Sequence, residues 1–346
     1  MRRWRLPGRS LILAPILAVL VLPVSCGSGA SPAQSDDRAD GQESPTYIVW
    51  VESIPRGTRP SASRIHCVNL EDGEEQELPG GEDGWVDHPA VSDQVVVWED
   101  SRETDNRIVA LDLTSGEEGP VSDGWGMASA ISGDWVVWEE EGTGPDKERT
   151  FIVARNLVSG LERTLANRGS AFSVSGDWLV WDIGKGRDEG HVELNEIWGM
   201  RLSTGKRMLL RPLSRCMLPV VEDGWVLWRR SDDRRVEAFS LRTRKVRLLP
   251  RGATTASDDG RVLICVGGQA AFDAGRNRLL VYELTSGRSA RVSGATGRIT
   301  WAGIHDGWVA WYDETHEGPL RVANLDSGET TTVAEAACLE PDLSRD

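Results

Sequence analysis

The stretch Gly133-Asp134-Trp135-Val136-Val137-Trp138 is a tight turn followed by a short apolar run that ends in Trp. The same pattern recurs with an Asp-Gly or Gly-Asp turn as Gly176-Asp177-Trp178-Leu179-Val180-Trp181, Asp223-Gly224-Trp225-Val226-Leu227-Trp228 and Asp306-Gly307-Trp308-Val309-Ala310-Trp311. Weaker copies end at Trp50, Trp98 and Ile264, so the motif occurs seven times. Self-similarity at about 40 residues indicates a repeat architecture, in which each unit buries its apolar faces against its neighbours.

A second marker recurs once in each unit. It is a strand ending in Leu, usually followed by a turn such as Thr114-Ser115-Gly116, where Gly supplies the positive φ of a tight hairpin. The Leu residues are Leu70, Leu113, Leu157, Leu202, Leu241, Leu284 and Leu325. A further short strand follows, for example Arg163-Thr164-Leu165, so each unit is predicted to hold four antiparallel strands.

Four antiparallel strands in about 40 residues, without helical periodicity, predict the blade of a β-propeller. The Trp strands are continuously apolar, as expected for a sheet covered on both faces, and Trp135 and Trp138 should point to opposite faces. Both markers count seven units. The prediction is therefore an all-β fold in which residues 46–346 form a single seven-bladed β-propeller of four-stranded antiparallel blades.

The two ends of the repeat region predict how the ring closes. The first unit begins directly at its Trp strand, Tyr47-Ile48-Val49-Trp50, without a leading strand. The segment Glu340-Pro341-Asp342-Leu343-Ser344 follows the last unit and matches the leading strands Pro89-Ala90-Val91-Ser92 and Phe172-Ser173-Val174-Ser175. We expect residues 340–344 to complete the first blade as its innermost strand, which leaves no open sheet edge.

The N-terminus has the composition of a targeting segment. Four Arg residues precede an apolar stretch, 11–24, that is too short to span a bilayer comfortably, which predicts a signal peptide over residues 1–25. The segment Leu22-Pro23-Val24-Ser25-Cys26-Gly27 resembles a bacterial lipobox, in which Cys26 would be lipidated and become the mature N-terminus. Cleavage as a soluble secreted protein and retention of the segment remain alternatives.

Residues 26–45 are predicted to be a flexible tether behind the lipidated Cys26, because Gly27 to Pro45 contains no large apolar residue. Such a linker reaches roughly 25 Å, so the domain would lie just off the bacterial cell membrane, on its extracytoplasmic side. The formal net charge is −15, and loss of residues 1–25, with four Arg and no acidic residue, would make it −19. This acidity argues against binding nucleic acid or docking on anionic lipid.

The repeats resemble those of TolB-like propellers, which occur in bacterial envelope and surface proteins. The resemblance covers residues 46–344 and is carried by Pro89-Ala90-Val91-Ser92, Asp93-Gln94-Val95-Val96-Val97-Trp98-Glu99-Asp100 and Arg107-Ile108-Val109-Ala110-Leu111-Asp112-Leu113-Thr114-Ser115-Gly116-Glu117. The sequence departs from the family in its sixth unit, where Arg261 and Ile264 replace Trp, and it lacks the Ser-Pro-Asp-Gly turn and the preceding α/β domain of TolB. The resemblance implies the propeller fold and an envelope location, but function does not follow from such a fold.

Recognition is expected on one rim of the ring, where the loops from second to third strands meet the connections between blades. Four variable segments rich in Gly and charge are assigned to this rim: 101–106, 141–149, 183–195 and 267–277. Two inter-blade connections carry Trp85 and Trp125 outside the strands. These residues are either an aromatic platform for a glycan or partner side chains, or hydrophobic cover over the blade edges.

Other chemistry is weakly indicated. The sequence contains no Gly-x-Ser-x-Gly motif, no phosphate-binding Gly loop and no suggestive pair of carboxylates. The histidines lack metal-ligand spacing, although two of them, His88 and His305, flank inner strands; the five are His66, His88, His191, His305 and His316. The acidic groups Glu139-Glu140-Glu141 and Asp182 with Asp188 and Glu189 are interpreted as solvated loop faces rather than calcium sites. No metal or cofactor is predicted.

Four cysteines follow Cys26: Cys67, Cys216, Cys265 and Cys338. An oxidising exterior would allow disulfides, but their pairing cannot be derived, and a buried free thiol is expected for each. Cys216 and Cys338 occupy equivalent places in distant repeats, which argues against a bridge between these two.

Two function classes follow. The favoured hypothesis is a non-catalytic, membrane-tethered binding or scaffold protein that recognises a protein or envelope component on its loop-rich rim. The alternative is a carbohydrate-active enzyme, a polysaccharide lyase or hydrolase, with its site at the channel mouth. Convergence of His88, His305 and carboxylates would favour the enzyme, and scattered histidines would favour the binding protein. A purely structural repeat protein is a third possibility.

Overall fold

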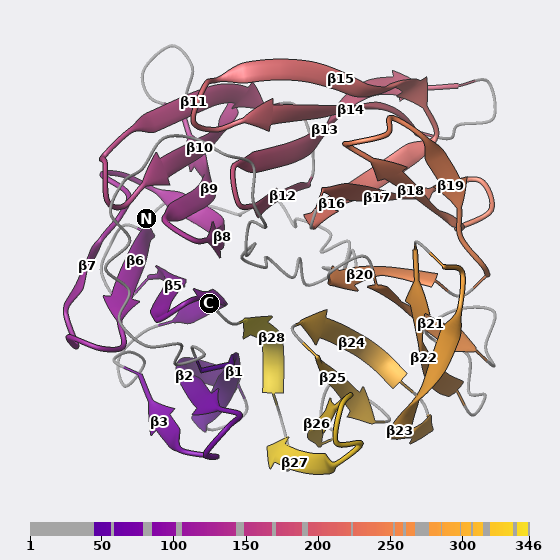
Figure 1. Cartoon of the computed structure of the whole chain (residues 1–346). Coiled ribbons are helices and arrows are strands. Elements are labelled where there is room, and N and C mark those ends of the chain that lie inside the picture. The colour runs from indigo at the N-terminus through magenta and orange to yellow at the C-terminus, as the bar shows by residue number, and fades with distance from the viewer. Residues whose placement is uncertain are drawn as a thin grey trace, which may run out of the picture.

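The computed structural model is an all-β propeller whose four-stranded antiparallel sheets stand side by side around a central axis (Figure 1). It describes residues 45–344, apart from 57–58, 79–84, 102–105, 143–148, 168–170, 189–192, 223, 252, 259–260, 267–276, 285, 298, 306, 314–318 and 335–337. Across these residues, no helix is long and apolar enough to cross a bilayer.

Each sheet runs from an inner strand near the axis to an outer strand at the circumference (Figure 1). The first sheets, from inner to outer strand, are β28 (Cys338–Ser344), β1 (Tyr47–Arg56), β2 (Arg59–Asn69) and β3 (Glu75–Glu77); β4 (Val86–Ser92), β5 (Val95–Asp100), β6 (Arg107–Asp112) and β7 (Glu118–Pro120); β8 (Gly126–Ser132), β9 (Trp135–Glu141), β10 (Thr150–Asn156) and β11 (Glu162–Asn167). The others are β12 (Phe172–Ser175), β13 (Trp178–Arg187), β14 (Glu193–Arg201) and β15 (Lys206–Ser214); β16 (Cys216–Glu222), β17 (Trp225–Arg230), β18 (Val236–Ser240) and β19 (Val246–Leu248); β20 (Ala253–Asp258), β21 (Arg261–Val266), β22 (Asn277–Glu283) and β23 (Ser289–Gly297); β24 (Ile299–His305), β25 (Trp308–Asp313), β26 (Leu320–Asn324) and β27 (Thr330–Ala334).

The predicted Leu marker sits one residue beyond the third strand of each blade. Leu113 donates its backbone N–H to the carbonyl of Gln94 at 2.8 Å, and Leu202 donates to Asp177 at 2.8 Å. These carbonyls belong to the turns between first and second strands. The backbone N–H of this Leu therefore bonds to the hairpin turn between the first and second strands and not to the neighbouring strand. This role explains why the spacing of the residue is so regular.

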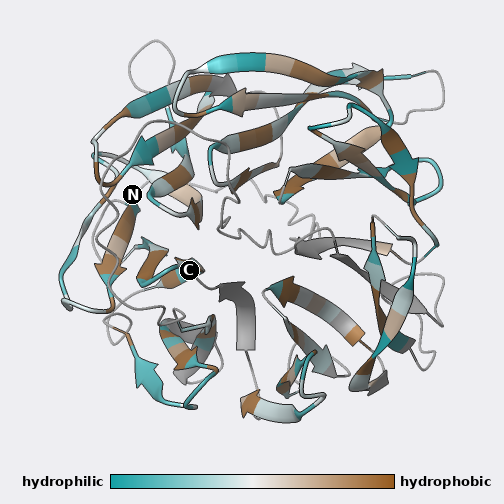
Figure 2. Cartoon of the chain, in the orientation of Figure 1, coloured by the Kyte–Doolittle hydropathy of each residue, from teal (hydrophilic) through white to brown (hydrophobic). Residues whose placement is uncertain are grey.

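The Trp strands form the interior, as predicted. Trp98, Trp138, Trp228 and Trp311 are at most 1% exposed. Trp135 packs with Phe172 of the following blade, whereas Trp138 packs with Val97 of the preceding one. The expectation that the two Trp side chains of one strand cover opposite faces is confirmed. Figure 2 shows apolar residues concentrated on the middle strands, in contrast to the hydrophilic outer strand β3.

The last strand of the chain pairs with the first. β28 runs antiparallel to β1, with Ser344 opposite Tyr47 and Leu339 opposite Val51. The register shifts between Val49 and Val51. The C-terminal segment 340–344 therefore pairs with the Trp strand of the first unit.

Two expectations about loops were wrong. Residues 183–187 belong to β13 and residues 193–195 to β14, because the hairpin pairing continues beyond Trp181 to Ile183 opposite Glu196. Asp182 is not a solvated loop residue, since it is fully buried and accepts a hydrogen bond from the backbone N–H of Ala171 at 3.2 Å.

One further acidic segment lies in a strand, and most of the other predicted loops lie outside the described residues. Residues 139–141 end β9, where Glu139 and Glu140 are half-buried and Glu141 is exposed. Residues 102–105, 143–148 and 267–276 of the predicted rim loops lie outside the described residues, as do residues 1–44, which include Cys26 and most of the expected tether.

Candidate functional site

Trp85 and Trp125 occupy equivalent places at the start of neighbouring inner strands. Trp85 directly precedes β4 and is 38% exposed, whereas Trp125 directly precedes β8 and is half-buried. The carbonyl of Trp85 accepts hydrogen bonds from the N–H and hydroxyl of Ser101, at 2.9 and 3.0 Å. Ser101 follows the second strand of that blade, so the two kinds of connection meet on one rim, as expected.

A β-bulge lies just inside this rim. Asp87 opposes Glu99 and Ala90 opposes Val97, so two residues of β4 face one residue of β5. His88, within the bulge, has a φ of 48°, and Ala128 and Leu218 repeat this left-handed conformation at 54°. Such a conformation costs a residue with a side chain about 1 kcal/mol, and a bulge redirects side chains that a regular strand would align.

The bulge brings His88 against a buried carboxylate. His88 Nδ1 lies 2.7 Å from Glu99 Oε1. Glu99 also accepts hydrogen bonds from the backbone N–H of Ala128 and from Asn106 Nδ2, the latter at 3.2 Å. Burial alone would raise the pKa of Glu99, but the hydrogen bond and charge of His88, helped by Ala128 and Asn106, outweigh it and lower the pKa. Glu99 is therefore held as a carboxylate that fixes the imidazole ring.

The same contacts join the two blades below Trp85 and Trp125. Ser129 donates to the carbonyl of His88 at 3.0 Å, and Asn106 Nδ2 donates to the carbonyl of Gly126 at 2.8 Å. The backbone N–H of Gly126 donates to Asn106 in return, at 2.9 Å. Two hydrogen bonds thus join Gly126, the first residue of β8, to Asn106, which directly precedes β6, and they hold the residue next to Trp125 in place.

The other described histidines do not join this group. His66 lies in β2, stacks on Trp50 and has Glu52 and Glu75 oxygens 3.0 Å from its two ring nitrogens. His305 ends β24 and is 4% exposed. Within the described parts of the chain, no group of three His, Cys, Asp or Glu residues is placed to hold a metal ion. His191 and His316 lie outside the described residues.

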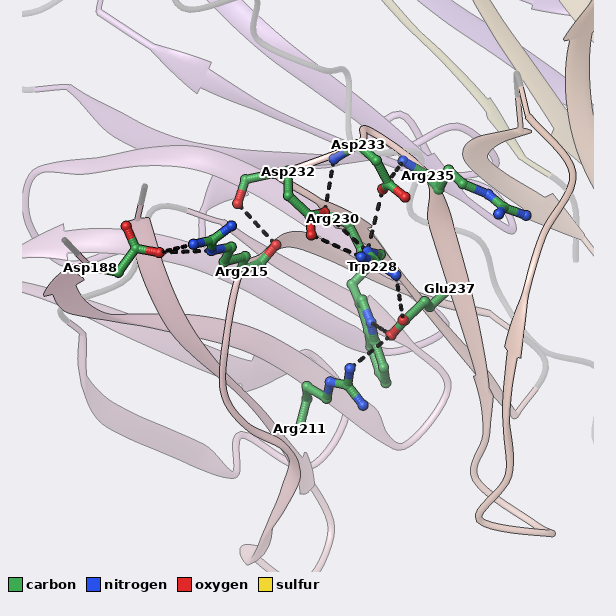
Figure 3. A network of polar contacts seen from close by, with 10 residues as sticks. Asp188, Arg211, Arg215, Trp228, Arg230, Asp232, Asp233, Arg235 and Glu237 are labelled. Atoms are coloured by element: carbon green, nitrogen blue, oxygen red, sulfur yellow. Dashed lines mark hydrogen bonds and ion pairs between the residues drawn. The ribbon is translucent and has the colours of Figure 1, made fainter. Parts of the chain in front are cut away.

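A second polar network on the same rim is absent from the sequence-based expectations (Figure 3). Arg215 directly precedes β16, as Trp85 precedes β4, and its Nε lies 2.7 Å from Asp188. The backbone N–H of Ser231 donates to the carbonyl of Arg215 at 2.7 Å, which repeats the bond between Ser101 and Trp85. The dense Arg and Asp content of residues 229–235 was the signal that could have indicated it.

Two described cysteines are buried free thiols, Cys67 and Cys216. Burial raises the pKa of Cys67 to about 12 despite a hydrogen bond with Gln76, and burial also raises the pKa of Cys216. Neither is a thiolate at neutral pH, so neither is suited to nucleophilic catalysis. The side chains of Cys265 and Cys338 lie outside the described residues.

The sequence matches no protein-family model and no curated protein at a significant level. The fold is similar to solved propellers. The β-propeller domain of the Trilobed protease from Pyrococcus furiosus, described as having an open velcro topology, has a TM-score of 0.63 at 15% identity, covering 84% of this chain and 94% of that one.

Two further structures show the same likeness. Pyrococcus horikoshii acylaminoacyl peptidase has a TM-score of 0.59 at 14% identity over 79% of this chain, which spans about half (48%) of the peptidase. TolB from Acinetobacter baumannii has a TM-score of 0.50 at 12% identity, covering 86% of this chain and 67% of TolB. At these identities the likeness establishes the propeller fold alone, which supports many functions.

Proposed function

We propose that this protein is a non-catalytic, extracytoplasmic binding or scaffold module, tethered to the membrane, that docks a protein or another envelope component on its loop-rich rim. The observation that carries the proposal is Trp85, a large aromatic residue left 38% exposed at the start of a rigid inner strand. Trp125 stands at the same place in the next blade, and aromatic anchors on rigid supports are typical of binding sites.

The scaffold of this module is a closed ring in our proposal. Each four-stranded sheet is one blade, which gives seven, and β28 is the inner strand of the first blade. The antiparallel pairing of Tyr47 with Ser344 and of Val51 with Leu339 supports this closure. A ring joined in this way has no open inner edge, so its rim loops are held in fixed relative positions.

The proposed cellular location of the module rests on the N-terminal sequence. Lipidation at Cys26 after removal of residues 1–25 would place the propeller on the extracytoplasmic side of the bacterial cell membrane, with residues up to 45 as a tether. The fold likeness to TolB, together with the repeat resemblance, supports a TolB-like propeller of the cell envelope. A mass of the mature protein that includes a diacylglyceryl group on Cys26 would be expected.

The alternative, a carbohydrate-active enzyme at the channel mouth, has one observation in its favour. Glu99 holds His88 Nδ1 at 2.7 Å, which is how a carboxylate orients an imidazole for catalysis or metal binding. This alternative predicts depolymerisation of an envelope polysaccharide that His88→Ala abolishes. Purified protein that releases no fragments from envelope glycans, with or without added divalent metal, would exclude it.

Site-specific photocrosslinking in cells tests the binding proposal. p-Benzoylphenylalanine is placed at position 85 or 125 of the full-length protein, and at position 158 as a control. Val158 is 79% exposed in the β10–β11 turn, on the opposite rim. The proposal expects a discrete crosslinked species from positions 85 and 125 only. Identical products from all three positions, or none from the two rim positions, would contradict it.

A further inference from the structure

One part of this acidic chain is strongly basic. Residues 206–251 contain thirteen Arg and Lys against five Asp and Glu, whereas the whole chain has 39 basic and 54 acidic residues. The stretch spans β15 to β19 and the connection to β20. Four of its arginines, at 229, 230, 234 and 235, lie together at the end of β17 and in the loop that follows it.

The acidic residues of this loop are already engaged by Arg230. Its guanidinium makes two hydrogen bonds to Asp232, at 3.1 and 2.8 Å, and lies 3.3 Å from Asp233 and 3.8 Å from Glu237 (Figure 3). Asp233 also accepts the backbone N–H of Arg235 at 3.1 Å. The hydrogen bond from Arg230 lowers the pKa of Asp232 to about 2, so this carboxylate is charged and committed to Arg230.

Arg229 points to the opposite face of its strand, since side chains alternate along β17. Leu227, on the same face as Arg229, packs with Leu249 and with Leu284 of the next blade. Arg229 is half-buried on the face that packs toward that blade. Among the described residues, the charged neighbour of its guanidinium is Arg234, and no acidic residue pairs with it. Burial lowers its pKa, and the positive charge of Arg234 adds to the effect.

Arg235 borders the same gap, and the charge of Arg234 acts on Arg229 from nearby. Arg235 Nη2 donates to the carbonyl of Leu249 at 2.7 Å, which holds the β17–β18 loop against the connection to β20. In Figure 3 the Arg235 side chain points away from Arg230. Arg234 is exposed and has a left-handed φ of 57°. Arg229 and Arg235 therefore both lie on the Leu249 side of the loop, and Arg234 is near enough for its charge to act on Arg229, whereas the carboxylates of Asp232 and Asp233 lie with Arg230.

We propose that the rim of the gap between the β16–β19 and β20–β23 blades, bordered by Arg229 and Arg235 with Arg234 nearby, binds a tetrahedral oxyanion. The ligand class is a phosphate or sulfate group carried on a larger molecule. A half-buried guanidinium such as that of Arg229, which has no counterion within the described part of the chain, is unfavourable, and a second positive charge near it increases the cost. Phosphate and sulfate oxygens accept from several guanidinium forks at once, whereas one planar carboxylate satisfies a single fork best.

Calorimetric titration with inorganic phosphate tests this site. Phosphate and sulfate should bind saturably at one site, and acetate at the same ionic strength should bind at least about tenfold more weakly. Arg229→Gln should weaken phosphate binding by about tenfold or more, because it removes a charge-assisted fork. Arg242→Gln is the matched control, since this exposed arginine lies in the β18–β19 turn on the opposite rim and should bind phosphate as the parent does.

Several results would overturn the proposal. These are phosphate heats that never saturate, acetate binding as tight as phosphate, or equal losses in the Arg229→Gln and Arg242→Gln variants. If Arg229→Gln does not fold, Arg234→Gln replaces it, because that side chain is exposed and its removal leaves the core intact. Trp85→Ala with Trp125→Ala should leave phosphate binding unchanged, so this test is independent of the proposed docking site. O-Phosphoserine and a monosaccharide sulfate then distinguish the two sources of the anion.

Discussion

Nδ1 of His88 lies 2.7 Å from Oε1 of Glu99, on the strand next to its own. A regular ladder would place one residue of β4 opposite Trp98, but the bulge places two there and gives His88 a left-handed φ of 48°. The strain of this conformation is offset by the contact between His88 and Glu99 and by the hydrogen bonds from the next blade. The contact therefore links a local backbone irregularity to the alignment of two blades.

Replacing Glu99 by Gln tests how much this link stabilises the fold. The variant replaces a buried carboxylate, which His88, Ala128 and Asn106 contact through donor groups, by a neutral amide. We expect the free energy of unfolding at pH 7 to fall by about 2 kcal/mol. Urea denaturation followed by Trp fluorescence measures it.

The pH dependence of the Glu99 effect has a definite sign. The pKa of Glu99 is lowered from 4.5 in the folded protein, so its contribution is complete above the unfolded pKa and is lost as pH falls through the folded pKa. The difference between parent and Glu99→Gln should therefore shrink below pH 4.5. An equal difference at pH 7 and at acidic pH would show that the charge is not responsible.

Gly126 is predicted to be intolerant of any side chain. A Cβ at this position would lie 2.9 Å from Ile108 Cγ1 and 3.1 Å from Trp138 Cδ1. Gly126→Ala should lower the free energy of unfolding by about 1–3 kcal/mol, because the buried Trp has little room to move. Gly119→Ala is the control, since a Cβ there meets nothing within 4 Å. Similar thermal melts for the two variants would refute the packing argument.

Deleting residues 339–346 should destabilise the whole domain. The deletion removes the strand opposite Tyr47 to Val51 and exposes the backbone edge of β1. A cooperative loss of melting temperature by circular dichroism is expected, and deletion of residues 345–346 alone serves as the control. Unchanged melting of the longer deletion would argue that the ring does not depend on β28.

Cys67 should be unreactive in the folded protein. Burial raises the pKa of its thiol to about 12, so the thiolate is scarce at pH 8. Iodoacetamide labelling with peptide mapping should leave Cys67 unmodified in buffer and modify it fully in denaturant. Rapid modification in buffer at pH 8 would mean that the β1–β2–β3 sheet opens readily.

Much of the fold could be predicted because the repeats encode it redundantly. Trp135 and Trp138 alternate faces of one strand, and each packs in a different interface between blades. Loop boundaries were less predictable, because hairpin pairing can continue through polar residues. Asp182 illustrates this point, since it is fully buried in a strand that looked like a charged loop.

The candidate site was predictable only in part. Trp85 and Trp125 could be identified from the sequence because they are large apolar residues in turns. How far each side chain is exposed, 38% for Trp85 and half-buried for Trp125, depends on the packing of neighbouring blades and could not be predicted. The pairing of His88 with Glu99 depends on a bulge that has no glycine to signal it. Arg229 and Arg230 point to opposite faces of β17, and only Arg230 reaches Asp232 and Asp233. This difference in partners depends on strand alternation and on the loop conformation, so the sequence alone does not reveal it.

An in-cell crosslinking pull-down decides whether the rim that carries Trp85 and Trp125 is the docking face. Tagged full-length protein is compared with the Trp85→Ala, Trp125→Ala double variant after both are shown to melt alike. Leu157→Ala with Val158→Ala is the control, because both side chains are exposed on the opposite rim. We expect a specific envelope component that is captured by the parent and the control and lost from the Trp variant. Equal capture by all three proteins, or no enrichment by any, would show that this rim is not the docking face.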